Sequence, residues 1–400
     1  MKSAFLRNAI VLGMLSAIGP FAIDMYLPAF PAIARDLSAD IGAVQMSLMS
    51  FFLAVALCQV LYGPISDRVG RKPPIYFGLT LFVIGGIGCS FATSAEALIA
   101  LRFVQGVGAC ASMVITRAII RDLHTGHEAA RLMATTMLVF SVSPILAPLA
   151  GSILTELFSW RVIFWAIALI GVGGLAVVAF LLPETRTPEA RQGSIGQGGV
   201  GSIARTYLGL VKDRRFLGLV FIGGLGQSSF FAYLAGSSVV FIEHFGLSPS
   251  AYSFVFATNA IAFIGGAQFN SFLMRRFGAE RVVRTAVSIF AALTSLLLVL
   301  TLGGLDNGFV LWGMLFAAFG CLGLVIPSTA VLALEAHGAH AGTASALMGT
   351  LQLCTGAFVI VLVSAFFDGT AMSMVTAIAG CGLIAMTLSW TLLRRSPSFR

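Results

Sequence analysis

The chain has 400 residues, 58% of them hydrophobic and only 10% charged, and its mean hydropathy is +0.97. A soluble domain is typically about a quarter charged. This composition therefore excludes an ordinary soluble domain and favours a bilayer, where a spanning segment needs no polar surface. A net charge of +8 is typical of nucleic-acid binding in soluble proteins, but here the basic residues follow a membrane pattern.

Apolar windows of about 20 residues, the length that crosses a bilayer, recur to the end of the chain. The first has a basic start like that of a signal peptide, but it continues into Asp24–Pro28, past any plausible cleavage site, and we interpret it as a membrane helix. The windows predict twelve spans, near residues 5–30, 42–62, 74–92, 96–117, 129–155, 161–182, 216–242, 250–273, 283–303, 309–333, 342–366 and 371–393.

The basic residues indicate the orientation. With the N-terminus in the cytoplasm, all but three of the 24 lysines and arginines fall on the cytoplasmic side, as the positive-inside rule requires. The exceptions are Arg35, Arg102 and Arg161. This bias predicts a multi-pass protein with both termini in the cytoplasm, and it accounts for the positive charge without nucleic acid.

A polar segment divides the spans into two sets of six. Residues 192–199 are rich in Gly, Ser and Gln, cannot cross a bilayer, and are typical of a flexible linker. A basic motif with a glycine follows both the second and the eighth spans, and Arg68 and Arg276 occupy matching places in it, 208 residues apart. The sequence therefore predicts an all-α protein of two six-helix bundles, 1–185 and 216–400, joined by a cytoplasmic linker, 186–215.

Metal and disulfide chemistry find little support in the sequence. All six cysteines fall in apolar stretches, none in a CxxC pair, and we interpret them as small buried hydrophobic residues. The pairs His124/His127 and His337/His340 have a metal-like spacing but lie in predicted cytoplasmic loops. We expect no metal and no cofactor.

The segment after the second span has the pattern G-x-x-x-D-R-x-G-R-K. Its glycines permit a tight turn between helices, and its acid could pair with an arginine or accept from a helix N-terminus. The charges alone would suit a topogenic loop, but the whole pattern resembles the signature loop of the major facilitator superfamily. The resemblance implies a conformational role for Gly63, Asp67, Arg68, Gly70, Arg71 and Lys72.

Further motifs extend this resemblance. Arg102–Gly106 is similar to the family's R-x-x-Q-G element. Pro144–Gly151 resembles the Pro/Gly motif of its proton-driven exporters, although Ala147 and Ala150 replace two glycines. The resemblance implies antiport, with conformational roles for Pro144, Pro148 and Gly151.

The first two spans carry the most specific part of the resemblance. Ile23–Pro28, Val44–Ser47 and Leu61–Pro64 resemble the Bcr/CflA subfamily of drug:proton antiporters. This implies a monomeric bacterial inner-membrane exporter of small lipophilic drugs, working by alternating access. It also suggests that Tyr26, Gln45 and Gln105 contact substrate.

Asp24 and Arg102 are the two ionisable residues that this span placement puts well inside the membrane. A charge at that depth costs at least ~2.5 kcal/mol, so it needs a partner or a purpose. An acid there suits a group that binds and releases a proton. The alternatives are an interfacial acid, with the helix ending early at Pro28, and a structural arginine. We expect both residues to serve proton coupling.

The second half carries no deep charge. Its mid-span polar and aromatic residues would suit uncharged lipophilic substrates, with ordinary helix packing as the alternative. The candidates are Gln227, Phe231 and Asn259.

Two other function classes remain to be weighed. A metabolite exporter of the same fold, carrying an amino acid or sugar, stays open. An enzyme is not expected, because no paired carboxylates and no nucleophile–His set fall at membrane depth.

Overall fold

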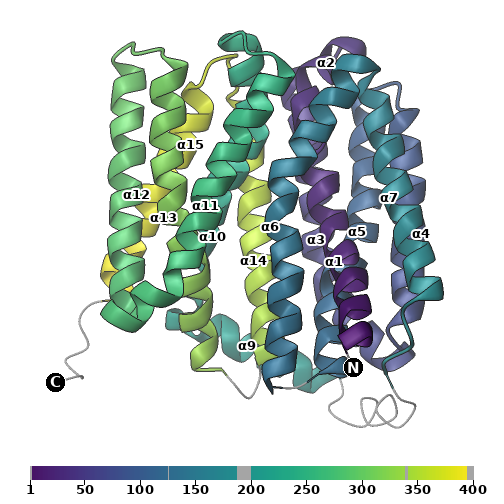
Figure 1. The fold of residues 1–400 in the computed structure, drawn as a ribbon. Helices are drawn as coiled ribbons and strands as arrows, with labels where there is room; N and C mark the ends of the chain where they lie inside the picture. Colours follow the sequence, from purple (N-terminus) through teal and green to yellow (C-terminus); the bar gives the residue numbers. More distant parts are fainter. Residues whose placement is uncertain (1, 125, 187–199, 338–340, 394–400) are drawn as a thin grey trace, which may run out of the picture. The chain divides into compact units, whose positions relative to one another are not determined.

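The computed structural model describes residues 2–124, 126–186, 200–337 and 341–393, and these are almost entirely helical (Figure 1). Within them, twelve helices are long and apolar enough to cross a membrane, which confirms the predicted count. The chain divides into two compact units. Unit 1 is Met1–Gly201 with Ser248–Phe254, and unit 2 is Ser202–Leu247 with Val255–Arg400.

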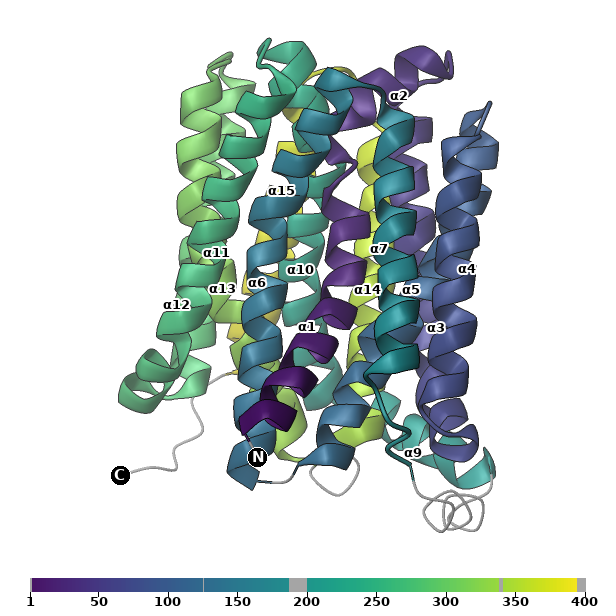
Figure 2. The ribbon, with the colours of Figure 1, turned by 45° about the vertical axis from the view of Figure 1, so that its right-hand side comes forward.

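Unit 1 begins with a span whose helix is broken towards its C-terminal end. Its spans are built from the elements α1 (Lys2–Asp24), η1 (Leu27–Ala29), α2 (Phe30–Asp36), α3 (Ile41–Val69), α4 (Lys72–Ser90), α5 (Ala95–Leu123), α6 (Gly126–Leu157) and α7 (Trp160–Phe180). Helix α5 packs against α3 and α4, and α1 packs against α6, as Figures 1 and 2 both show.

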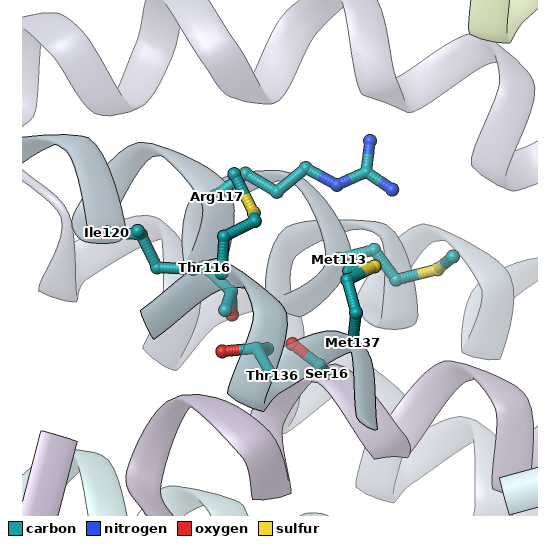
Figure 3. A pocket seen from close by; sticks show the side chains of 8 residues that line it. Ser16, Met113, Thr116, Arg117, Ile120, Thr136 and Met137 are labelled. Atoms are coloured by element: carbon teal, nitrogen blue, oxygen red, sulfur yellow. The ribbon is translucent and has the colours of Figure 1, made fainter. Parts of the chain in front are cut away.

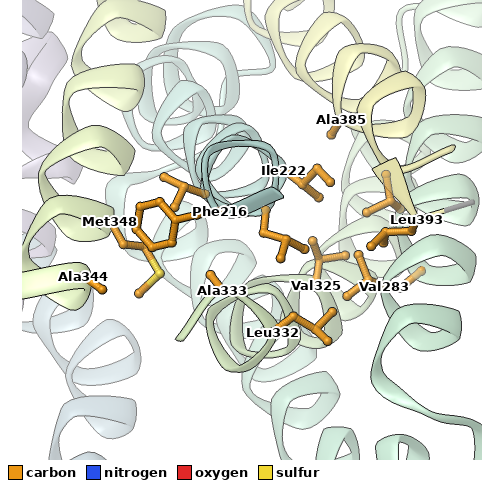
Figure 4. Close-up of a cluster of buried hydrophobic side chains, with 14 of the residues drawn as sticks. Phe216, Ile222, Val283, Val325, Leu332, Ala333, Ala344, Met348, Ala385 and Leu393 are labelled. Atoms are coloured by element: carbon orange, nitrogen blue, oxygen red, sulfur yellow. The ribbon is translucent and has the colours of Figure 1, made fainter. Parts of the chain in front are cut away.

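Unit 2 repeats the pattern of six spans. Its elements are α9 (Val200–Lys212), α10 (Arg214–Val239), the π-helical turn η2 (Val240–His244), α11 (Pro249–Phe277), α12 (Ala279–Leu302), α13 (Gly308–Glu335), α14 (Ala341–Ala365) and α15 (Met372–Leu392). The first residues of α9 and α11 group with unit 1. A cluster of buried apolar side chains from α10, α12, α13, α14 and α15 holds one end of the unit together (Figure 4).

The structure differs from the predicted linker over Val200–Lys212, which forms α9. Ile203, Tyr207 and Leu210 recur at helical spacing, and Leu210 is buried in the apolar cluster of unit 2. That apolar stripe outweighs the polar character of the surrounding sequence. The Gly/Ser/Gln run itself lies outside the described residues, and the proposed bundle limits stay a prediction.

Several helices are longer than their apolar windows. The second predicted span, 42–62, is the core of α3, which continues to Val69. The fourth, 96–117, continues to Leu123 in α5. Hydropathy marks only the part of a helix that lies in hydrocarbon, so polar extensions into the interface escape it.

Candidate functional site

The first span breaks at Asp24, and the sequence explains why. A helix continuing past this point would need the backbone N–H of residue 28 to donate to the carbonyl of Asp24, but Pro28 has no N–H. Helix α1 therefore ends at Asp24, and the short 3₁₀ turn η1 leads into α2. The span as a whole runs from Phe5 to Asp36, so the break lies within it.

Asp24 is the only Asp or Glu whose side chain is buried in the described part of the chain, with 5% of its surface exposed. Its carboxyl group makes no hydrogen bond or ion pair with any other described residue. Broken helices at membrane depth commonly mark ion and substrate sites in transporters. An unpaired acid at such a break can take up and release a proton.

Helix α6 packs directly on this break. A Cβ atom added to Gly151 would overlap the carbonyl oxygen of Met25, the residue after Asp24. Only glycine allows this approach, which gives Gly151 of the Pro/Gly motif a physical role. The two prolines of that motif lie inside α6, where Pro148 cannot donate to the carbonyl of Pro144.

Arg102 lies fully buried in a cage of aromatic rings. Its guanidinium carbon is 4.3 Å from the ring centre of Tyr26, 4.4 Å from that of Phe51 and 6.0 Å from that of Phe164. One terminal nitrogen donates to Gln105 Oε1 at 2.6 Å. We call these five residues the arginine cage. It joins the broken first span to α3, α5 and α7.

The cage contains donors without acceptors. Nε and Nη2 of Arg102 and Nε2 of Gln105 are buried and have no hydrogen-bond partner. Tyr26 Oη lies 3.2 Å from Ser47 Oγ, whose own proton goes to the carbonyl of Val44. Buried unpaired donors are costly, and a group that supplied acceptors here would be stabilised.

The structure brings together three of the predicted substrate and coupling residues, Tyr26, Arg102 and Gln105, in this cage. Gln45 is buried on α3, the helix that carries Ser47 and Phe51. In the structure Arg102 is held by aromatic rings and an amide and by no carboxylate, and its role in proton coupling stays a prediction. No ion pair joins it to Asp24 among the described residues.

The motif after the second span is not a loop for most of its length, which corrects the sequence interpretation. Gly63, Asp67 and Arg68 lie in the last two turns of α3, and Gly63 makes no turn. The chain reverses at Gly70, whose φ of 102° lies in the region that favours glycine. Arg71 follows it, and α4 begins at Lys72.

Arg71 is the centre of an ionic network at this turn, with 3% of its surface exposed. Its guanidinium group pairs with Asp67 at 2.7 Å and with Asp122 of α5 at 2.7 Å. Burial alone would lower the pKa of Arg71, but the hydrogen bonds and charges of the two carboxylates outweigh burial and raise it. The network fastens the ends of α3 and α5 to each other.

Sequence reasoning missed two members of this network. Glu184, after α7, accepts from the backbone N–H groups of Arg71 and Lys72 at 2.9 and 3.1 Å, so it caps α4. Asp122 belongs to the charged end of α5, beyond the apolar window. The only sequence signal was an acid close to a span end, which is too common to single these residues out.

The second unit repeats the glycine reversal. Gly278, between α11 and α12, has a φ of 82° and lies 208 residues after Gly70. The same offset of 208 residues separates Arg68 and Arg276, the two arginines from which we infer the repeat.

The three predicted substrate residues of unit 2 lie on α10 and α11. Asn259 is buried and donates to Tyr233 Oη at 3.0 Å. Phe231 packs on α14 so closely that a Cβ at Gly356 would overlap its ring. Gln227 is half-buried on α10. Helix packing therefore accounts for Phe231 and Asn259, and their contact with substrate stays a prediction.

The cysteines and histidines show no shared chemistry. The six cysteines are free thiols, three of them buried. No group of His, Cys, Asp or Glu among the described residues has the arrangement of a metal site. His340 and the side chain of His127 lie outside the described part.

Comparisons with known proteins give one consistent picture. The sequence profile of the Major Facilitator Superfamily matches residues 12–361. An uncharacterized MFS-type transporter, YdgK of Bacillus subtilis, is 36% identical over 94% of both chains. A bicyclomycin resistance protein homolog of Haemophilus influenzae is 34% identical over 100% of this chain and 99% of that one. The multidrug resistance protein MdtL of Escherichia coli is 27% identical over 92% of this chain and 91% of its own.

Solved structures resemble the fold. A mutant of the nucleoside transporter NupG superposes with a TM-score of 0.77 at 14% identity, covering 98% of this chain and 100% of that one. A D-xylose–proton symporter gives 0.75 at 15% identity, covering 97% of each.

Proposed function

Because the chain belongs to the major facilitator superfamily, and is thus a multi-pass membrane transporter, we propose that it is a proton-coupled exporter of small lipophilic drugs. Relatives named for bicyclomycin and multidrug resistance support the substrate class. The basic-residue bias supports a bacterial inner-membrane location with both termini in the cytoplasm. We propose that it works as a monomer and confers resistance to the drugs it exports.

One observation carries the coupling: Asp24 is a buried, unpartnered acid at the break of the first span. In the proposed cycle, Asp24 takes a proton from the outside and releases it to the cytoplasm as drug is captured. Neighbouring Arg102 holds Tyr26 and Phe51 in place, so the cage fixes the backbone that presents Asp24. The drug and the proton then compete with each other, because both bind to the same set of conformations of the transporter.

The energy of one proton is sufficient. A proton crossing ~150 mV releases about 3.5 kcal/mol, at ~2.3 kcal/mol per 100 mV. Since ~1.4 kcal/mol corresponds to a tenfold ratio, one proton supports a drug gradient of roughly a few hundredfold for an uncharged compound.

The coupling is tested in everted membrane vesicles with an acidified lumen. Adding a neutral drug should release protons from wild-type vesicles, and Asp24→Asn should reduce that release to below about a tenth, because the amide cannot carry a proton. Asp40→Asn is the matched control, since Asp40 is exposed at the start of α3 and caps nothing with its side chain. Normal proton release from Asp24→Asn vesicles would remove the basis of the proposal. A response to amino acids or sugars but to no drug would favour a metabolite exporter instead.

A further inference from the structure

A small cavity of about 20 Å³ opens between α1, α5 and α6 of unit 1, away from the arginine cage (Figure 3). Three hydroxyl-bearing residues, one from each helix, line it together with three methionines. The residues are Ser16, Thr116, Thr136, Met113, Met133 and Met137. A space of this size holds roughly one water-sized group.

One of the hydroxyl groups in the cavity is unsatisfied. Thr116 is 1% exposed, and its Oγ1 has no hydrogen-bond partner. Thr136, by contrast, donates to the carbonyl of Leu132. In Figure 3 the oxygens of Ser16, Thr116 and Thr136 gather at one side of the cavity. A buried hydroxyl without a partner can still make a hydrogen bond, and the cavity has room for one further polar group beside it.

Arg117 borders the same cavity and is exposed although it lies within a span. It makes no ion pair, hydrogen bond or ring contact with any described residue. Figure 3 shows its guanidinium group extended away from the three hydroxyls, so the side chain bridges from the cavity outwards. The sequence places Arg117 among the basic residues of the cytoplasmic side, and in the structure it also borders this cavity.

The position of Arg117 suits a molecule that arrives from the cytoplasm. It lies six residues before the end of α5 at Leu123, about 9 Å along the helix. It follows Arg102 by 15 residues, which is just over four helical turns, so the two side chains leave α5 about 60° apart. Helix α5 thus carries a second, unpaired arginine beyond the cage, closer to its C-terminal end.

The charges inside unit 1 favour one sign of substrate. Arg102 and Arg117 are cationic, and Asp24 is the one buried acid of the described chain. A cationic compound would meet the uncompensated positive charge of Arg117, whereas an anion would supply the partner that this arginine lacks. The methionine side chains are apolar and adaptable, so they suit the non-polar body of such a molecule.

We infer that the cavity and Arg117 form the entry site for the acidic group of an amphipathic organic acid. One carboxylate oxygen accepts from Thr116 in the cavity, the guanidinium group of Arg117 compensates the charge, and the apolar body lies against Met113 and Met137. This rests on the proposed function and names a substrate class within it: aromatic or aliphatic acids beside neutral drugs, and not organic cations.

The test measures binding by purified full-length protein, using 1-naphthaleneacetic acid and its amide as a matched pair. Wild type should bind the acid about tenfold more tightly than the amide, since a hydrogen bond to a charged group is stronger than one to a neutral group. Arg117→Gln should weaken the acid about tenfold and change the amide less than twofold. Arg117→Lys should retain most of the preference, and Thr116→Val should weaken the acid about threefold.

Arg121→Gln is the control, because Arg121 is an exposed arginine one turn further along α5 and does not line the cavity. It should leave both affinities unchanged. Equal binding of acid and amide by wild type, or an equal loss of both probes in Arg117→Gln, would overturn the inference. Since binding needs no proton gradient, an acid preference that persists while Asp24→Asn vesicles respond normally would refute the proposed coupling alone.

Discussion

At the scale of single residues, Arg102 shows how a charge is held within a membrane protein without a counter-ion. Three aromatic rings and the Gln105 side chain surround it, and no carboxylate takes part among the described residues. Arginine suits such a place, because its planar group stacks on rings and is weakly hydrated, whereas an ammonium group is compact and strongly hydrated.

The cage predicts that Arg102→Lys destabilises the protein by about 1–2 kcal/mol, the magnitude of a desolvated cation–π contact with its hydrogen bond. Thermal unfolding in detergent measures it. Arg161→Lys serves as the comparison, because Arg161 also stacks on a ring, that of Trp160 at 4.3 Å, but is partly exposed. Its effect should be smaller, below ~1 kcal/mol. If the two substitutions lowered the free energy of unfolding equally, the prediction that the buried cage stabilises the protein more than an exposed stacking contact would be wrong.

Sequence could single out Asp24 and Arg102, because charges are rare in apolar windows. It could not supply their surroundings. Phe51 and Phe164 are 51 and 62 residues from Arg102, and nothing local distinguishes them among the 33 phenylalanines. Arg117 was missed for the opposite reason, since an arginine near a cytoplasmic helix end is usually topogenic.

At the scale of elements, the contact between α6 and the break of the first span is the tightest feature near Asp24. Gly151→Ala should lower stability and transport together, because the new methyl group must displace the Met25 carbonyl. Thermal unfolding and drug-induced proton release measure the two effects. Gly173→Ala is the control: nothing lies within 4 Å of its Cβ, and a helical alanine should stabilise α7 by up to ~1 kcal/mol. A neutral Gly151→Ala would show that α6 does not fix the break.

Element types and span count followed from hydropathy, but element ends did not. The sequence predicts a span near 5–30 with an early end at Pro28 as the alternative, and the N–H that Pro28 lacks explains the break at Asp24. By contrast, the ionic ends of α3 and α5 lie beyond the apolar windows, so the sequence predicts a loop around Asp67 where the structure has helix. Of the two glycines in this motif, only Gly70 lies where the chain reverses its direction.

At the scale of the whole molecule, two units of six spans share a glycine reversal at matching places. The repeat was visible in sequence because its turn needs glycine and carries arginines beside it in both halves. The sequence also predicts substrate residues in unit 2, but packing alone explains side chains such as Asn259 and Phe231, so their contact with substrate stays a prediction.

The central claim is that drug and proton compete through Asp24, and the most direct measurement is proton release on drug binding. Purified protein in weakly buffered detergent solution is titrated with a neutral drug at a pH where Asp24 holds its proton, and the released protons are counted. The account predicts about one proton per drug molecule bound by wild type, and none by Asp24→Asn although it still binds drug. Equal proton release from the two proteins, or drug binding by wild type without any release, would contradict it.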